Sequence, residues 1–254
     1  MAHPARIWDY WLGGKDNFAA DRAVGDEVLE VMPAMGPIAR GGRAFLALAV
    51  HYLAATIGIR QFLDIGTGLP TANNTHEVAQ QVAPESRIVY VDNDPIVLTH
   101  ARALLTSDAQ GTTAYIDADL RDTGKILAEA RSTLDFSQPV AVMLLAILHF
   151  IPDEDNPHGI VAKLMEPMAS GSYLVLSHVS SDIEAGGLAD AVKRYNQASA
   201  VQAHLRSREE VTRFFDGLEI IEPGVVPLPR WRPGKVNTEA RRSLPTYTAV
   251  ARKP

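Results

Sequence analysis

The chain has 254 residues, a formal net charge of −6 at pH 7 and no cysteine. The lack of cysteine excludes disulfide bonds, thiolate metal sites and a cysteine nucleophile, and the acidic balance disfavours duplex nucleic acid, which requires clustered Lys and Arg. The longest apolar run, residues 140–148, is far shorter than the ~20 residues of a membrane span, and residues 1–10 lack the apolar segment of a secretory signal. We therefore predict a cytoplasmic protein with no membrane partner and no metal site.

The rest of the chain alternates short apolar runs with amphipathic helices, which predicts an α/β fold with a mostly parallel sheet covered by helices on both faces. In residues 1–42 we expect short helices and loops that lie over the sheet without a core of their own. An amphipathic helix follows over 43–57. We expect strands at 61–64, 87–91, 113–116, 140–146, 173–177, 218–221 and 246–252, and a proline-rich loop at 223–233. We divide the chain into an N-terminal helical segment, 1–42, and one compact domain, 43–254.

Side chains that can cap helices mark several helix starts. Asn74 precedes Glu77 by three residues, which is capping-box spacing. Asp94 stands directly before Pro95, as an N-cap residue does when proline occupies the first helical position. We therefore expect one helix to begin after Asn74 and another after Asp94.

The first predicted strand ends in a glycine-rich turn that contains Asp64, Gly66, Thr67 and Gly68. Glycines there let a ligand approach the backbone closely, and the helix start behind them attracts anions. A dinucleotide fingerprint would carry Gly or Ala at position 71, where this chain has Thr71 after Pro70. The Asp64 carboxylate suits the ammonium group of an amino acid, which favours S-adenosylmethionine over NAD. A tight turn without a ligand is the alternative for this motif alone.

Two further strand ends carry acids. Asp92 ends the second strand, where a carboxylate can accept both ribose hydroxyls, and Asn93 beside it is placed to line the adenine. Asp119 and Leu120 follow the third strand, where a carboxylate and a backbone amide can bind the adenine edge. The alternative is that an acid after the second strand only caps the next helix, and we assign that task to Asp94. The three strand ends together predict an adenosine site.

The fourth and fifth strand ends supply the candidate catalytic residues. Ligands in open α/β sheets lie at the carboxyl ends of the strands, so Ala146 is expected to face the methyl donor. His149 is a candidate general base, although a structural histidine at a strand end is the favoured interpretation. His178, after the fifth strand, is the second candidate base.

Five sequence segments carry a more specific signal: RIWDYWLGGKDNFAADR at 6–22, QFLDIGTGLPT at 61–71 followed by Asn74 and His76, YVDNDP at 90–95, ADLRD at 118–122 and LHFIPD at 148–153. Together they resemble a bacterial family of S-adenosyl-L-methionine-dependent methyltransferases once designated a domain of unknown function. The resemblance implies a class I, Rossmann-like sheet of seven strands with the last strand antiparallel. It implies S-adenosyl-L-methionine as the donor and S-adenosyl-L-homocysteine as the product, and it adds Asn74 and His76 to the donor site.

Two positions depart from the general class I pattern. Pro70 stands where a third glycine is usual, which agrees with this family. Gly42 stands where a polar residue is expected before Arg43, which puts a donor contact at that helix start in doubt.

The N-terminal segment adds the candidate donor-binding residues Tyr10, Gly13, Gly14, Lys15 and Asn17. The amides of Gly13 and Gly14, with Lys15, offer a site for the donor carboxylate, and Trp8, Tyr10 or Trp11 offers an aromatic face to the sulfonium. The residues alone favour a solvated turn with aromatic side chains packed on the sheet. The resemblance favours a helical lid over the donor, which we adopt.

The predicted function is methyl transfer from S-adenosyl-L-methionine to an unidentified acceptor. We expect residues 8–18, 146–152 and 223–233 to line the acceptor pocket, and their apolar, aromatic character predicts a small molecule as substrate. One alternative is a donor-binding sensor or regulatory protein without catalysis. A nicotinamide-dependent oxidoreductase is the other, and Asp64, Pro70 and Thr71 disfavour it. No oligomeric state is predicted.

Overall fold

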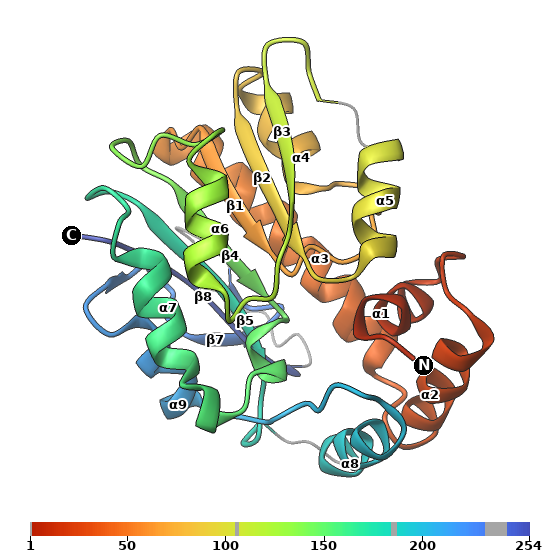
Figure 1. Cartoon of the computed structure of the whole chain (residues 1–254). Coiled ribbons are helices and arrows are strands. Elements are labelled where there is room, and N and C mark those ends of the chain that lie inside the picture. The colour runs from red at the N-terminus through yellow and green to blue at the C-terminus, as the bar shows by residue number, and fades with distance from the viewer. Residues whose placement is uncertain (1, 105–106, 184–186, 232–242) are drawn as a thin grey trace.

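The computed structural model describes residues 2–104, 107–183, 187–231 and 243–254 (Figure 1). This part of the chain forms one sheet of eight strands in the order β3-β2-β1-β4-β5-β8-β6, with β7 also paired to β8. The strands are β1 Gln61–Ile65, β2 Arg87–Asp92, β3 Thr112–Asp117, β4 Ala141–Leu145, β5 Tyr173–Val179, β6 Glu219–Ile220, β7 Val226–Leu228 and β8 Leu244–Arg252. The first five run parallel, and β8 is antiparallel to β5. The predicted α/β fold is confirmed.

The predicted number of seven strands is wrong, because β7 is an additional strand inside the segment that we expected to be a loop. β6 and β7 pair with successive parts of β8, so they share one edge position of the sheet. Pro227 in the middle of β7 has no backbone N–H, and strands with proline are confined to sheet edges. The sequence pattern concealed β7 because proline and a short length both argue against a strand.

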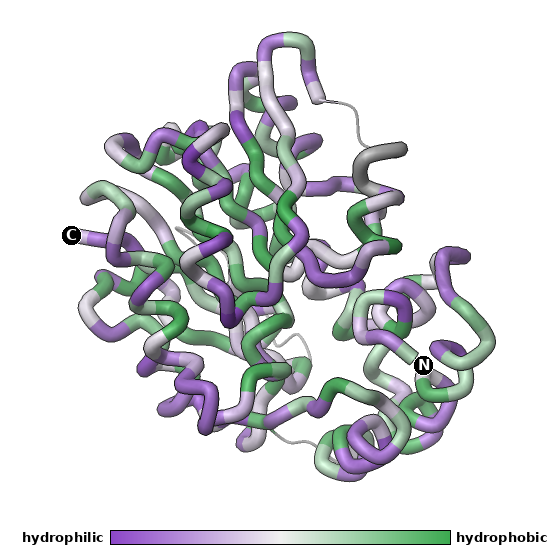
Figure 2. The backbone as a smooth tube through the Cα atoms, in the orientation of Figure 1, coloured by the Kyte–Doolittle hydropathy of each residue, from purple (hydrophilic) through white to green (hydrophobic). Residues whose placement is uncertain are grey.

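Helices cover both faces of the sheet. The α-helices of the described residues are α1 Pro4–Leu12, α2 Ala19–Val31, α3 Met35–Tyr52, α4 Thr75–Val82, α5 Pro95–Leu104, α6 Thr123–Ala130, α7 Pro157–Met165, α8 Leu188–Ala198 and α9 Arg208–Thr212. In the parallel strands, Leu63 and Val89 face one layer with α6 and α7, and Phe62 and Ile88 face the other with α3 and α4. Burial on both faces explains the apolar sequence of the central strand β4, AVMLL, and hydrophobic green predominates among the central strands in Figure 2.

The N-terminal region forms an apolar cluster of its own, against our expectation. α1, α2 and the first half of α3 pack with α8, and Ile7, Val28, Ile38 and Tyr195 are among the buried members of this cluster. α3 begins eight residues earlier than the expected helix at 43, so the division at 42/43 lies inside one continuous helix.

Gly41 and Gly42 lie inside α3, and neighbouring side chains come close to both. A Cβ on Gly41 would lie 3.3 Å from Leu244 Cδ1, and one on Gly42 would lie 3.6 Å from Trp8 Cζ2. Small residues at these positions allow the helix to pack closely, and α3 continues through the pair.

The predicted helix caps are confirmed. Asn74 and Glu77 form a capping box at the start of α4, and Glu77 Oε2 accepts from the Asn74 N–H at 2.8 Å. Asp94 Oδ1 accepts from the N–H of Ile96 at 2.9 Å, at the start of α5. Since Asp94 performs the capping, the side chain of Asp92 is available for another task.

Within the described ranges, no helix is both long and apolar enough to cross a membrane. The same ranges contain no group of three or more His, Cys, Asp or Glu side chains placed to hold a metal ion.

Candidate active site

A cavity of about 660 Å³ lies at the carboxyl ends of the parallel strands. Its floor comes from the strand ends of β1 to β5, its roof from α1, and one wall from residues 200–204 between α8 and α9. The predicted site residues that line it are Asp64, Gly66, Thr67, Gly68, Asp92, Asn93, Asp119, Leu120 and Ala146. The three strand ends that the sequence analysis joined into one adenosine site therefore do meet in one cavity.

The glycine turn after β1 has two glycines in the left-handed region, with φ of +76° at Gly66 and +67° at Gly68. A Cβ atom on Gly66 would lie 2.8 Å from the Ile147 side chain. A Cβ atom on Gly68 would have nothing within 4 Å. Gly66 thus allows β1 and the end of β4 to approach, and Gly68 leaves open space at the cavity wall.

Asp64 is a buried carboxylate on the cavity wall. Thr75 donates its hydroxyl to Asp64 Oδ2 at 2.6 Å, the one hydrogen bond to this carboxylate among the described residues. Burial raises the pKa of Asp64 to about 6, against the opposing effects of the Thr75 hydrogen bond and the nearby Arg43. Because few hydrogen bonds offset the burial of this carboxylate, a cationic ligand group beside it would stabilise its charge.

Asp92 ties the first two strand ends together. Its Oδ2 accepts from the Gly68 N–H at 2.9 Å, and its Oδ1 accepts from the Asp94 N–H at 3.0 Å. Burial raises the pKa of Asp92, and these backbone hydrogen bonds act in the opposite direction. Each oxygen keeps a further lone pair, so the carboxylate can still accept from a ligand hydroxyl.

Asp119 is held by Arg121. The Arg121 backbone N–H donates to Asp119 Oδ1 at 2.8 Å, and Arg121 Nη1 lies 3.1 Å from Asp119 Oδ2. Asn93 Nδ2 also donates to Asp119 Oδ2, at 3.3 Å, which joins the second strand end to the third. Leu120 is buried and supplies apolar lining.

Ala146 has an unusual backbone at the end of β4, with φ of +53°. Its N–H donates to the Ser177 carbonyl at 3.1 Å and to the Ser177 hydroxyl oxygen at 3.0 Å. A non-glycine residue in this region stores strain, which is typical of functional sites. The bend directs the chain after β4 along the cavity.

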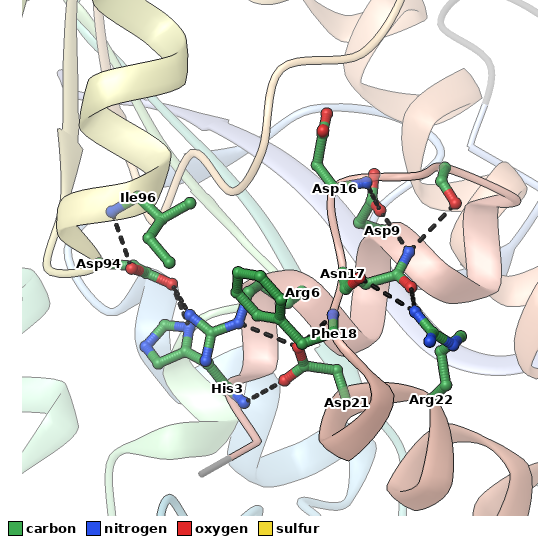
Figure 3. A network of polar contacts seen from close by, with 11 residues as sticks. His3, Arg6, Asp9, Asp16, Asn17, Phe18, Asp21, Arg22, Asp94 and Ile96 are labelled. Atoms are coloured by element: carbon green, nitrogen blue, oxygen red, sulfur yellow. Dashed lines mark hydrogen bonds and ion pairs between the residues drawn. The ribbon is translucent and has the colours of Figure 1, made fainter.

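α1 is fixed over the cavity by a buried ion network (Figure 3). Arg6 Nη1 donates to Asp94 Oδ2 at 2.7 Å, and Arg6 Nε donates to Asp21 Oδ2 at 3.1 Å. His3 Nδ1 lies 3.0 Å from the same Asp94 oxygen. The network joins α1 both to α2 and to the loop after β2, and it brings His3, Pro4, Ala5, Trp8, Asp9 and Leu12 to the cavity.

The N-terminal donor residues predicted from the sequence lie outside the cavity lining. Tyr10 donates its hydroxyl to Asp26 Oδ1 at 2.5 Å. Asp9 Oδ2 accepts from Asn17 Nδ2 at 2.8 Å, and the Gly14 N–H donates to the Asp9 carbonyl at 2.9 Å. Gly13, Gly14, Lys15 and Asn17 thus belong to a turn organised by Asp9, and of the three candidate aromatic residues Trp8 alone lines the cavity among the described residues.

Asn74 and His76 lie behind the glycine turn and also do not line the cavity. Asn74 caps α4 and accepts from the Thr71 N–H at 3.1 Å. His76 is buried, with Nδ1 2.9 Å from the Tyr90 hydroxyl, which also accepts from the His76 backbone N–H at 2.8 Å. Asn74 thus holds the loop that follows the glycine turn, and His76 joins α4 to β2.

Comparison with known proteins identifies the family. The profile of a family described as S-adenosyl methyltransferase matches residues 1–254. The chain belongs to this family. It is therefore an enzyme that uses S-adenosyl-L-methionine as its methyl donor. No curated protein matches the chain.

Solved structures agree with the family. A DUF574 family protein from Streptomyces avermitilis is 47% identical, with a TM-score of 0.94 over 100% of this chain and 98% of that one. A protein from Thermobifida fusca, described as a candidate methyltransferase, is 38% identical, with a TM-score of 0.89 over 99% and 95%. The N-methyltransferase NodS from Bradyrhizobium japonicum, solved with S-adenosyl-L-homocysteine, is 14% identical, with a TM-score of 0.52 over 98% and 99%, and shows the shared class I fold.

The two histidines predicted as bases do not line the cavity of this methyltransferase. His178 Nδ1 lies 2.7 Å from the Val179 carbonyl, and its Nε2 lies 2.9 Å from Arg206 Nη1. Burial is the main reason why the pKa of His178 falls to about 3. Burial likewise lowers the pKa of His149 well below its ordinary value, with His178 and Arg206 adding to the effect. Both are neutral groups in the protein interior, which agrees with the structural interpretation of His149.

Arg206 is the residue that sequence analysis missed most completely. Its guanidinium is buried and donates to the carbonyls of Leu148 at 3.0 Å and Ile151 at 2.8 Å, and to Asp153 Oδ1 at 2.6 Å. It thereby binds the segment after α8 to the turn after β4. No periodicity marks this residue, because these three partners are more than 50 residues away in the chain.

The acceptor side of the cavity is also lined differently from our expectation. Residues 223–231 contribute nothing to the lining, and residues 232–233 lie outside the described ranges. Trp231 is buried against Phe45 and Tyr52, with ring centroids 5.4 Å and 6.0 Å apart. Residues 200–204 take the place that we assigned to the loop. The other expected segments do contribute, through Trp8, Asp9 and Leu12 and through residues 146, 147 and 150–152.

Proposed function

We propose that this methyltransferase binds its donor across the ends of β1, β2 and β3 and transfers the methyl group to a small molecule. The observation that carries the proposal is the meeting of Asp64, Asp92 and Asp119 in one cavity at these three strand ends. A cavity of about 660 Å³ falls in the range of small-molecule sites.

The residues present fit the ribose, the adenine and the ammonium group of the donor. The carboxylate of Asp92 is assigned to the ribose hydroxyls, and Asn93, Asp119 and Leu120 are assigned to the adenine. Asp64 is assigned to the ammonium group, because its buried carboxylate accepts one hydrogen bond from the described residues and has a raised pKa that a neighbouring cation would lower again.

The donor supplies a methyl group activated by the positive sulfur. The protein has to exclude water from this group and orient an acceptor in line with it, and positioning of this kind lowers the barrier substantially. α1 provides the cover, since the Arg6 network holds it over the strand ends. We therefore assign the helical segment 1–42 as a lid, with Trp8 rather than the turn at 13–17 as its cavity-facing part.

We also infer a bacterial protein, because the two relatives of high identity come from Streptomyces and Thermobifida. The cytoplasmic location and the absence of a nucleic-acid partner stay predictions from the sequence.

A thermal-shift comparison tests the donor assignment. S-adenosylhomocysteine at ~100 times its dissociation constant should stabilise the protein by ~2.7 kcal/mol. NAD at the same concentration should leave the melting temperature unchanged. Stabilisation by NAD alone would overturn the proposal. Incubation with labelled donor and cell extract then tests the transfer, and tight donor binding without any labelled product would favour a sensor.

A further inference from the structure

The strand order divides the cavity into two sides. The donor residues assigned above stand at the ends of β1, β2 and β3, which form one half of the sheet. The ends of β4 and β5 form the floor of the other half, and the connection between α8 and α9 closes it. Figure 1 shows this connection crossing below the end of the sheet, in cyan to blue.

Apolar side chains dominate this second side. Ile147 and Phe150 come from the turn after β4, and Ala200 and Val201 come from the connection between α8 and α9. Trp8 of α1 also lines the cavity. Such a surface suits a flat, apolar molecule.

His204 stands on this apolar side as a polar group in a fixed position. Its backbone N–H donates to the His149 carbonyl at 2.7 Å. The preceding residue, Ala203, is held by Asn196 through two hydrogen bonds of 2.7 Å and 2.9 Å. Arg206 anchors the other side through its buried guanidinium. The backbone on both sides of His204 is therefore constrained, and the residue lines the cavity.

The ionisable side chains that line the cavity differ in whether they have partners. Within the described part of the chain, most are engaged in hydrogen bonds or ion pairs: His3, Asp9, Arg43, Asp64, Asp92, Asp119 and Arg121. The side chains of His204 and Glu154 have no such partner, and Glu154 is exposed to solvent. His204 is thus the partly shielded ionisable group that is available to a second ligand.

We propose that this second side is the acceptor subsite, that it takes a flat apolar molecule carrying a nucleophilic hydroxyl, and that His204 is the base for that hydroxyl. The inference rests on the proposed function, because it takes the opposite side of the same cavity for the donor.

The step that follows is balanced in atoms and charge. The acceptor hydroxyl gives its proton to the free ring nitrogen of His204 while its oxygen forms a bond to the methyl carbon. The bond between that carbon and the donor sulfur breaks, and its electron pair stays on the sulfur. The products are a methyl ether, S-adenosylhomocysteine and a protonated His204, which then releases the proton to water. Neutral histidine is the side chain best suited to accept a proton near pH 7.

Binding of a probe tests the subsite separately from the donor site. Calorimetry should show 2-naphthol binding to the wild-type protein saturated with S-adenosylhomocysteine. His204→Ala should weaken 2-naphthol binding by ~10-fold, as loss of one hydrogen bond does, and should leave the affinity for S-adenosylhomocysteine unchanged. If S-adenosylhomocysteine binds but 2-naphthol does not, the acceptor inference is overturned and the donor assignment stands. Failure of S-adenosylhomocysteine itself to bind overturns the proposed function.

Methyl transfer tests the role of His204 as a base. With labelled donor, His204→Gln should slow methylation of 2-naphthol by ~100-fold, the usual contribution of a general base. 4-Nitrophenol is ionised at weakly alkaline pH and needs no base, so its methylation should fall by less than ~10-fold. His51→Gln, an exposed position at the end of α3, is the matched control and should change neither rate. Equal losses for both phenols, or no methylation of either phenol by the wild type, would overturn the assignment.

Discussion

Nη1 of Arg6 donates a hydrogen bond of 2.7 Å to Oδ2 of Asp94, across 88 residues of chain. Asp94 caps the start of α5 and follows the acid at the end of β2 by two residues, so this contact helps to hold α1 over the donor side of the cavity. The contact is buried at both ends, with 10% and 4% of the two side chains exposed.

Replacing Arg6 tests how strongly the roof is held. Arg6→Ala leaves Asp94 and Asp21 without their cation in a buried site, so we expect the free energy of unfolding in urea to fall by ~3 kcal/mol. Arg194→Ala breaks the exposed pair between Arg194 and Glu30, 2.8 Å apart, and should cost less than ~1 kcal/mol. Similar small losses in both variants would show that the Arg6 network does not stabilise α1.

Asp92→Ala tests the ribose assignment. Loss of two hydrogen bonds to a carboxylate amounts to ~3 kcal/mol, so the dissociation constant of S-adenosylhomocysteine should rise by ~100-fold in calorimetry. Asp117→Ala is the matched control. Asp117 is opposite Asp92 in the strand register, but its side chain is exposed and does not line the cavity. An unchanged dissociation constant in Asp92→Ala would contradict the assignment.

Asp64 makes stability depend on pH in a defined direction. Its pKa is about 6 in the folded protein and 3.8 ordinarily, so between about pH 4 and 6 the folded protein holds a proton that the unfolded chain has lost. The free energy of unfolding therefore falls as pH rises through this window, by about 3 kcal/mol from this group. Asp64→Asn should remove that fall. If the difference in free energy of unfolding between the wild type and Asp64→Asn stays constant from pH 4 to 7, the raised pKa of Asp64 is contradicted.

The same titration should appear in donor binding. The ammonium of S-adenosylhomocysteine favours the ionised form of Asp64, so the wild-type affinity should rise between pH 5 and 7. Asp64→Asn should lose this rise, while keeping whatever pH dependence comes from other groups. If the affinity changes with pH in the same way in both proteins, the ammonium group does not bind beside Asp64.

The two glycines of the turn should respond differently to alanine. Gly66→Ala adds a clash with Ile147, of ~1–3 kcal/mol, to the ~1–2 kcal/mol of a left-handed backbone, and should therefore destabilise more than Gly68→Ala. Gly68→Ala should lower the free energy of unfolding only by the cost of the left-handed backbone. The added methyl group should nevertheless weaken binding of S-adenosylhomocysteine.

Gly58→Ala is the control for that pair. Gly58 has φ of +91° with nothing within 4 Å of a Cβ, and it does not line the cavity. It should lose as much stability as Gly68→Ala, measured in urea, with no change in ligand affinity. Equal affinities for Gly58→Ala and Gly68→Ala would mean that the turn does not contact the donor.

The donor side could be predicted from sequence because its signals are local. Asp64, Asp92 and Asp119 each follow an apolar strand, and parallel strands bring their carboxyl ends to one edge of the sheet. Capping residues such as Asp94 were predictable for the same reason, since their partners lie within a few residues.

The acceptor side and the roof could not be predicted, because contacts distant in the sequence determine both. Residues 200–204 have no periodic pattern, and their position depends on Arg206 binding the carbonyls of Leu148 and Ile151. The Gly13–Gly14 turn resembled an anion site, but its N–H groups already donate to the carbonyls of Tyr10 and Asp9 in α1. β7 was missed because pairing with β8, and not its own composition, makes it a strand.

The contact between α2 and α8 has a mechanical consequence. α2 packs on α1, the roof of the donor side, and α8 leads directly into the wall of the acceptor side. Val28 of α2 and Leu188 of α8 are buried in the same cluster, so separating the two helices would expose both to water. The roof over the donor side and the wall of the acceptor side are therefore joined through one apolar cluster, so a substitution that loosens this cluster should disturb both sides of the cavity.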